Sequence, residues 1–112
     1  MKNFLVLFRE PDGRTNKHTD EEIKLHRKRW EKWLSQWKTE GKFTGGGGLT
    51  LNGRLIKGKD VRVTNEIHQT GTEIVGGYLL IKANDLDEAA KIIRNCPIYE
   101  FDGYAEIREV QP

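Results

Sequence analysis

The sequence predicts one α+β domain, spanning residues 1–112, in which two helices cover one face of an antiparallel sheet. Two short apolar runs, Phe4–Phe8 and Tyr78–Ile81, are typical of buried strands. Each run is followed by a segment with apolar residues at helical spacing, one at about 20–40 and one beginning near Asp85. A chain of 112 residues has the usual length of a single domain.

The first helix is predicted from its ends as well as from its periodicity. The strand at Phe4–Phe8 is followed by charged residues and the turn-forming sequence Pro11-Asp12-Gly13. Thr19, with Glu22 three residues later, has the spacing of a capping box, and Gly41 supplies a C-terminal stop. The apolar stripe between these ends is formed by Ile23, Trp30, Leu34 and Trp37, with Trp33 at its flank.

The middle of the chain is predicted to be extended. The run Gly45–Gly48 is followed by a strand rather than a helix, so it indicates a bulged strand or close approach of backbones and not a phosphate-binding loop. Asn52-Gly53, within the alternating segment Leu49–Leu55, predicts a hairpin turn. A further short strand is expected at Val61–Val63, and a polar loop over residues 64–73.

The second half of the chain repeats the order of strand, helix and strand. The strand Ile74–Ala83 precedes a helix that Asp85 caps and that Pro97 ends. After a turn at Asp102-Gly103, alternation over Tyr104–Val110 predicts the last strand. The complete order is that of the split βαβ, or ferredoxin-like, arrangement.

The two predicted central strands are apolar on both faces, although only two helices are available to cover the sheet. The second face would otherwise be an exposed apolar patch, which monomeric proteins rarely carry. A second copy of the chain is the simplest cover. We therefore expect a homodimer that packs sheet to sheet.

Composition and charge exclude several classes of protein. Charged residues make up 32% of the chain, yet the net charge is only +2, so nucleic acid and anionic membranes are not expected partners. The longest apolar run is too short to span a bilayer. A lone Cys96 excludes an intrachain disulfide and a CxxC zinc or redox site. The residues Met1-Lys2-Asn3 show no signal-peptide pattern, so we expect a cytoplasmic protein. We also expect that it needs no metal or cofactor.

Two histidines are candidates for proton transfer. His26 falls at the edge of the apolar stripe of the first helix, near Trp30 and Trp33, where indole rings would shift its pKa. The alternative for His26 is a packing role. His68 and Glu66 form a carboxylate–imidazole pair only if the polar loop folds back on itself.

The tryptophans of the first helix supply more aromatic area than a two-helix layer usually needs, although such a cluster commonly belongs to the core. We therefore expect a ligand cleft between this helix and the sheet. Arg9 is expected to hold a carboxylate group of the ligand. The other side chains expected to contact the ligand are Trp30, Trp33, Asn65 and Tyr78.

Several short motifs also occur in a characteristic order and spacing. They are Phe4–Phe8, Trp30-x-x-Trp33, Gly41-Lys42-Phe43, Val75-Gly76-Gly77-Tyr78, Asp85-Leu86-Asp87-Glu88-Ala89, Cys96-Pro97 and Ala105-Glu106-Ile107-Arg108. Together they resemble the YCII-related proteins of the DGPF subgroup along nearly the whole chain. The signature of that subgroup, Val-Thr-Asp-Gly-Pro-Phe, is replaced at the same spacing by Val63-Thr64-Asn65-Glu66-Ile67-His68.

The resemblance implies a ferredoxin-like fold that assembles into a dimeric α/β barrel. Relatives are described as enzymes by likeness to muconolactone isomerase-type and chlorolactone-dehalogenating proteins, and others accompany extracytoplasmic-function sigma factors. Some relatives have a proposed His–Asp site with its histidine on the first helix. By spacing, that position holds Trp30 in this chain, one turn after His26.

Two functions remain open at this point. The first is a small enzyme that performs acid–base chemistry on a small hydrophobic or aromatic acid, in the cleft between the first helix and the sheet. Its catalytic residues would be His26, His68 and Glu66. The second is a non-catalytic dimer that binds a small ligand or acts as a regulatory accessory protein.

Overall fold

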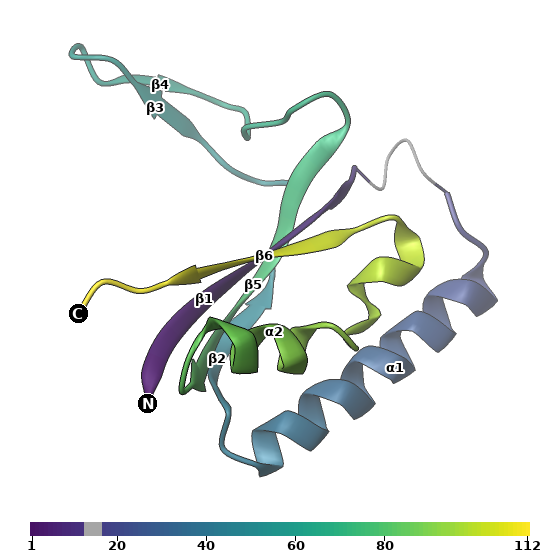
Figure 1. Ribbon diagram of the computed structural model, residues 1–112. Coiled ribbons are helices and arrows are strands. Elements are labelled where there is room, and N and C mark those ends of the chain that lie inside the picture. Colours follow the sequence, from purple (N-terminus) through teal and green to yellow (C-terminus); the bar gives the residue numbers. More distant parts are fainter. Residues whose placement is uncertain (13–16) are drawn as a thin grey trace.

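A four-stranded antiparallel sheet and two helices form the body of the molecule in a computed structural model (Figure 1). The structure describes residues 1–12 and 17–112. The strands lie in the order β2-β5-β1-β6, which is the order of the split βαβ arrangement, and the α+β prediction is confirmed. The elements of this body are β1 (Lys2–Pro11), α1 (Asp20–Thr39), β2 (Phe43–Gly48), β5 (Glu73–Ala83), α2 (Leu86–Ile93), the 3-10 helix η1 (Pro97–Phe101) and β6 (Tyr104–Glu109).

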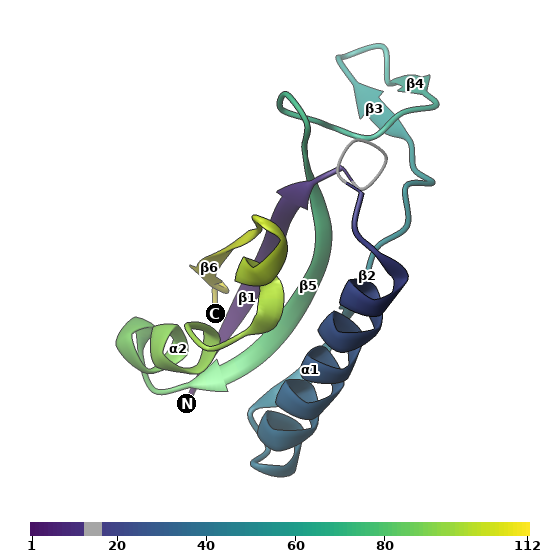
Figure 2. The same ribbon diagram turned by 90° about the vertical axis from the view of Figure 1, so that its right-hand side faces the viewer.

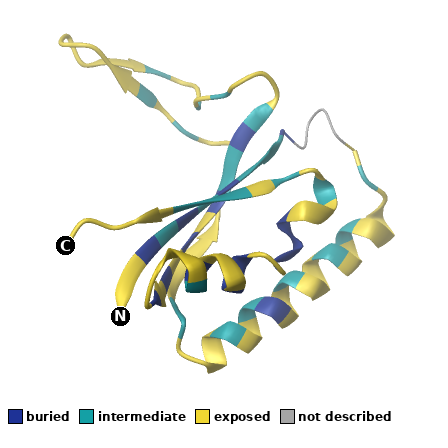
Figure 3. Ribbon diagram, in the orientation of Figure 1, coloured by how far each residue is buried: buried dark blue, intermediate teal, exposed yellow. Residues whose placement is uncertain are grey.

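The core lies between the sheet and the helices, which cover the same face of the sheet (Figure 2). Phe4 and Val6 of β1 are fully buried and pair with Ile81 and Leu79 of β5. The strands were expected to be buried on both faces, but in the single chain only the helix-covered face is sealed. Leu80, on the opposite face, remains 36% exposed, because no element among the described residues covers it. Figure 3 shows how buried and more exposed positions follow one another along the strands.

The first helix begins at the predicted capping box. The Thr19 hydroxyl accepts a hydrogen bond from the backbone N–H of Glu22, and the Glu22 carboxylate accepts one from the backbone N–H of Thr19. These bonds lower the pKa of Glu22 below its usual range. At the other end, Gly41 adopts a positive φ of 73°, which favours glycine after a helix. The turn predicted from Pro11 to Gly13 extends beyond the described residues.

The second helix packs on the core through Ala89, Ile92 and Ile93, and Asp85 caps it as predicted. The sequence indicated only a stop at Pro97, whereas the chain continues as η1. Pro97 suits the start of such a helix because its fixed φ is helical and its missing N–H needs no partner there. None of the helices within the described residues has the length and apolar character that crossing a membrane requires.

A small hairpin projects from the body and is called the arm here; it consists of β3 (Leu55–Lys57), β4 (Arg62–Thr64) and their turn (Figures 1 and 2). The turn predicted at Asn52-Gly53 is wrong, since the chain reverses at residues 58–61, where Gly58 has a positive φ of 80°. Gly53 serves another purpose. A Cβ at position 53 would clash with the side chain of Ile67, so the glycine allows the two loops to approach closely.

We expect the capping box to contribute measurably to stability. Thr19→Ala should lower the free energy of unfolding by about 1 kcal/mol, because the first turn loses a side-chain acceptor. The stabilisation by Glu22 is fully present above its ordinary pKa of 4.5 and is lost as the pH falls through its lowered pKa. Urea denaturation at neutral and strongly acidic pH measures both effects.

Thr39→Ala is the matched control, because the Thr39 hydroxyl donates only to the Ser35 carbonyl at the far end of the same helix. Equal losses of stability in the two variants would contradict the assignment of the cap.

Candidate functional site

A cleft of about 530 Å³ lies between α1 and the sheet, where the sequence predicted a ligand site. Its size falls within the range of small-molecule sites. Aromatic side chains form much of its wall, among them Phe8 of β1, Trp30 of α1 and Phe101 of η1. The cleft is also lined by glycines of two strands, namely Gly47 and Gly48 of β2 and Gly76 and Gly77 of β5.

The glycines keep the cleft open. They contribute backbone where other residues would place side chains. At Gly46, just before the lining pair on β2, an added Cβ would overlap the Tyr78 carbonyl oxygen. The predicted close approach of backbones is therefore confirmed at this strand pair.

Glu10 places a carboxyl group in the cleft. Successive side chains of β1 alternate between the two faces, so Glu10 shares the helix face with Phe8. The register of β1 and β5 shifts between Phe8 and Arg9, leaving Gly76 unpaired, and a Cβ at Gly76 would overlap the Glu10 carboxyl oxygen. The bulge and its glycine thus make room for the carboxyl group.

The electrostatic state of Glu10 is unusual. Burial raises the pKa of Glu10 above its ordinary value of 4.5. Within residues 1–12 and 17–112, its side chain makes no hydrogen bond or ion pair. A half-buried carboxyl group without a partner is a common feature of functional sites, because its protonation can change at a useful pH.

His26 lies on the opposite wall and is held by three neighbours. The indole N–H of Trp30 donates to Nε2 at 3.0 Å, so the neutral ring carries its proton on Nδ1. Nδ1 faces Glu100 at 3.9 Å, and the ring stacks on Phe101 with centroids 4.2 Å apart. Burial lowers the pKa of His26, and the Glu100 carboxylate partly opposes this effect.

Phe101 is itself held between two imidazole rings. The His18 ring stacks on it at 3.7 Å, nearly parallel, and His26 stacks on it as well. Arg29 and Glu100 form an ion pair beside this stack. The contacts join α1 to η1 and fix one end of the cleft.

Arg27 brings a positive charge to the cleft. Its side chain is exposed, and it forms no ion pair or hydrogen bond with any described residue. A guanidinium group of this kind can bind the carboxylate of a ligand through two parallel hydrogen bonds.

A family model of the YCII-related domain matches residues 4–112. The chain belongs to the YCII-related domain family. Among solved structures, it is similar to the 5-chloro-2-hydroxyhydroquinone dehydrochlorinase TftG from Burkholderia phenoliruptrix AC1100, in complex with 2,5-dihydroxybenzoquinone. The two share 12% identity with a TM-score of 0.50, over 97% of this chain and 93% of that chain. A comparison with curated proteins gives no match.

The residues predicted for the site of this YCII-related protein separate into two groups. His26 and Trp30 line the cleft. Tyr78 borders it, but the alternation of β5 turns its side chain to the opposite face of the sheet, the face of Leu80. Trp33 lies in the core instead, where it is 7% exposed and packs against Phe43.

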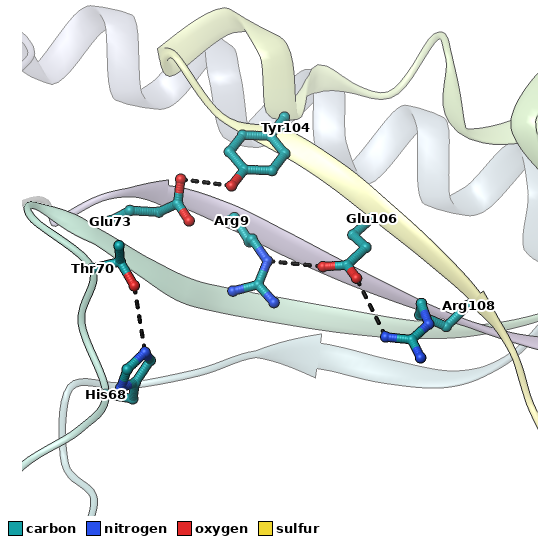
Figure 4. A network of polar contacts seen from close by, with 7 residues as sticks. All are labelled: Arg9, His68, Thr70, Glu73, Tyr104, Glu106 and Arg108. Carbon is teal, nitrogen blue, oxygen red and sulfur yellow. Dashed lines mark hydrogen bonds and ion pairs between the residues drawn. The ribbon is translucent and has the colours of Figure 1, made fainter.

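The remaining predicted residues lie outside the cleft. Arg9 cannot reach a ligand there, because the alternation of β1 turns it to the opposite face of the sheet, where it pairs with Glu106 (Figure 4). Asn65, Glu66 and His68 lie in the loop between β4 and β5.

The predicted His68–Glu66 pair does not form. The Glu66 carboxylate accepts a hydrogen bond from the Thr64 hydroxyl, while the His68 ring lies 3.4 Å from the Thr70 hydroxyl (Figure 4). The loop does not fold back in the way such a pair requires. Among the described residues, no group of three or more His, Cys, Asp or Glu side chains is arranged to hold a metal ion.

Sequence reasoning missed Glu10 and Arg27. A signal for Glu10 was present, since Phe4, Val6, Phe8 and Glu10 share the two-residue period of one strand face. Arg27 follows His26 directly, but its charge alone does not distinguish it from the other basic residues of the helix.

The hydrogen bond from Trp30 should help to keep His26 neutral, because a protonated Nε2 cannot accept it. Trp30→Phe is expected to raise the pKa of His26, because the neutral form loses this hydrogen bond. An NMR titration of the imidazole signals measures this change. Trp37→Phe, on the same helix, is the matched control, and an unchanged His26 pKa in Trp30→Phe would refute the assignment.

Proposed function

We propose that this YCII-related protein is a small enzyme that transfers protons on a small, planar hydrophobic or aromatic acid. The observation that carries the proposal is the half-buried carboxyl group of Glu10 inside the cleft, which has no partner among the described residues. A carboxyl group with a raised pKa can exchange a proton nearer to neutral pH than an ordinary one.

Each wall of the cleft has a part in this proposal. Glu10 is the acid or base, and Arg27 takes the role of binding the ligand carboxylate that the sequence had suggested for Arg9. His26, neutral at physiological pH, is a second proton-transfer group. Aromatic walls and bare glycine backbone together favour a flat ring, and TftG was solved with the flat ring of 2,5-dihydroxybenzoquinone.

One observation favours the alternative of a non-catalytic binding or regulatory protein. Nε2 of His26 already accepts a hydrogen bond from Trp30, so the imidazole must give up that bond before it can take a proton at this atom. The same cleft would then serve binding alone. Calorimetry and deuterium exchange separate the two functions, because the first measures binding and the second measures proton transfer.

The proposal also includes the oligomeric state, the cellular location and the subgroup of the protein. The partly open sheet face, with Leu80 at 36% exposure, supports the predicted sheet-to-sheet homodimer. A cytoplasmic location and membership of the DGPF subgroup also remain proposals, based on the sequence features described above.

Deuterium exchange into 2,5-dihydroxybenzoquinone tests proton transfer directly. The ring C–H signals should decay faster in D₂O with the protein than in buffer, and Glu10→Gln should slow the catalysed exchange by about 100-fold or more. If Glu10 acts as the base, the rate should fall as the pH drops through its pKa, which lies above 4.5. Proton NMR follows the exchange, and calorimetry measures binding.

Glu109→Gln, an exposed carboxylate on β6, is the matched control. Glu10→Gln should be at least as stable as the parent protein at pH 8, because ionisation of a half-buried carboxyl group costs folding free energy once the pH rises past its ordinary pKa. Binding without accelerated exchange would leave the accessory function. No binding at all would remove the cleft as the site.

A further inference from the structure

A second cavity, of about 320 Å³, lies on the sheet face opposite the cleft. Arg9 of β1 and Glu73 and Val75 of β5 line it from the sheet. Leu49 and Ile67, from the segments that connect the sheet to the arm, close its sides. Its volume is at the lower end of the range for small-molecule sites, so it would admit only a small ligand.

Among the described residues, Arg9 has a partner along one edge of its guanidinium group and none along the other. Its Nε–H donates to the Glu106 carboxylate at 3.0 Å, and Glu106 is also 3.5 Å from Arg108 (Figure 4). The two terminal nitrogens of Arg9 make no hydrogen bond with any described residue. They form the planar fork that binds a carboxylate through two parallel bonds.

Glu73 supplies the opposite charge in the same cavity. One of its carboxylate oxygens accepts a hydrogen bond of 2.7 Å from the Tyr104 hydroxyl, which fixes the side chain (Figure 4). Tyr104 pairs with Arg9 across β6 and β1, so the two charges flank the same position on the sheet. The second oxygen of Glu73 has no partner among the described residues and can accept a bond from an ammonium group.

The charged side chains in and beside the cavity favour one kind of ligand. A simple anion would meet Arg9 but also the carboxylates of Glu73 and Glu106, whereas a simple cation would meet Arg9 unfavourably. A molecule with one charge of each sign satisfies both free groups. Leu49, Ile67 and Val75 offer apolar surface beside them.

We propose that this cavity binds a small apolar α-amino acid as its zwitterion. The carboxylate lies on the free edge of Arg9, the ammonium group on Glu73, and the side chain against Leu49, Ile67 and Val75. The site is separate from the cleft, because Arg9 and Glu10 point to opposite faces of β1. It also lies beyond the apolar pair of Leu5 and Leu80, so a partner on that part of the sheet need not fill it.

Calorimetry with three ligands of similar shape tests the proposal. L-Leucine carries both charges, 4-methylpentanoate lacks the ammonium group, and 3-methylbutylamine lacks the carboxylate. Leucine should bind at least tenfold more tightly than either analogue, since each analogue leaves one charged group of the cavity without a partner.

Variants at the two charges sharpen the test. Arg9→Gln should remove the preference for leucine over the amine, and Glu73→Gln the preference for leucine over the acid. Loss of a specific preference would not result from general damage to the fold, which circular dichroism monitors. Glu109→Gln, which removes a neighbouring charge outside the cavity, should bind leucine as the parent protein does.

Three results would overturn the proposal. The first is that the folded parent protein binds none of leucine, isoleucine and valine at millimolar concentration. The second is that leucine binds no better than both analogues. The third is that Arg9→Gln and Glu73→Gln keep the preferences of the parent protein unchanged.

Discussion

The pairing of β1 with β5 is the constraint on which the rest of the structure depends. Both strands lie in the centre of the sheet, and their alternation decides which residues face the helices. Phe4, Val6 and Phe8 enter the core through this alternation. The same alternation carries the neighbours Arg9 and Glu10 to opposite faces, so one strand supplies a charged group to each of two cavities.

The local signals of the sequence were sufficient for the body of the fold. The capping residues Thr19 and Asp85 fixed where the helices start, since their hydrogen bonds involve only residues three positions away. The arm was harder to predict. Asn52-Gly53 has the composition of a hairpin turn, but a contact distant in the sequence, with Ile67, determines what Gly53 does.

The candidate site was predictable only in part, for a related reason. The position of the cleft followed from the aromatic residues of α1, whose spacing along a helix is local information. Arg9 was assigned to it from its charge alone, although the period of the strand places it on the other face. The His68–Glu66 pair depended on the path of a loop, and no regular pattern in the sequence determines that path.

The bulge at Gly76 links two positions that are distant in the sequence. A side chain at position 76 would meet the Glu10 carboxyl group, so the end of the Glu10 side chain would have to leave its present position. Natural variation at the two positions should therefore be correlated within the family. A shorter residue 10 would leave room for a side chain at position 76, whereas a side chain there would displace the carboxyl group from its present place in the cleft.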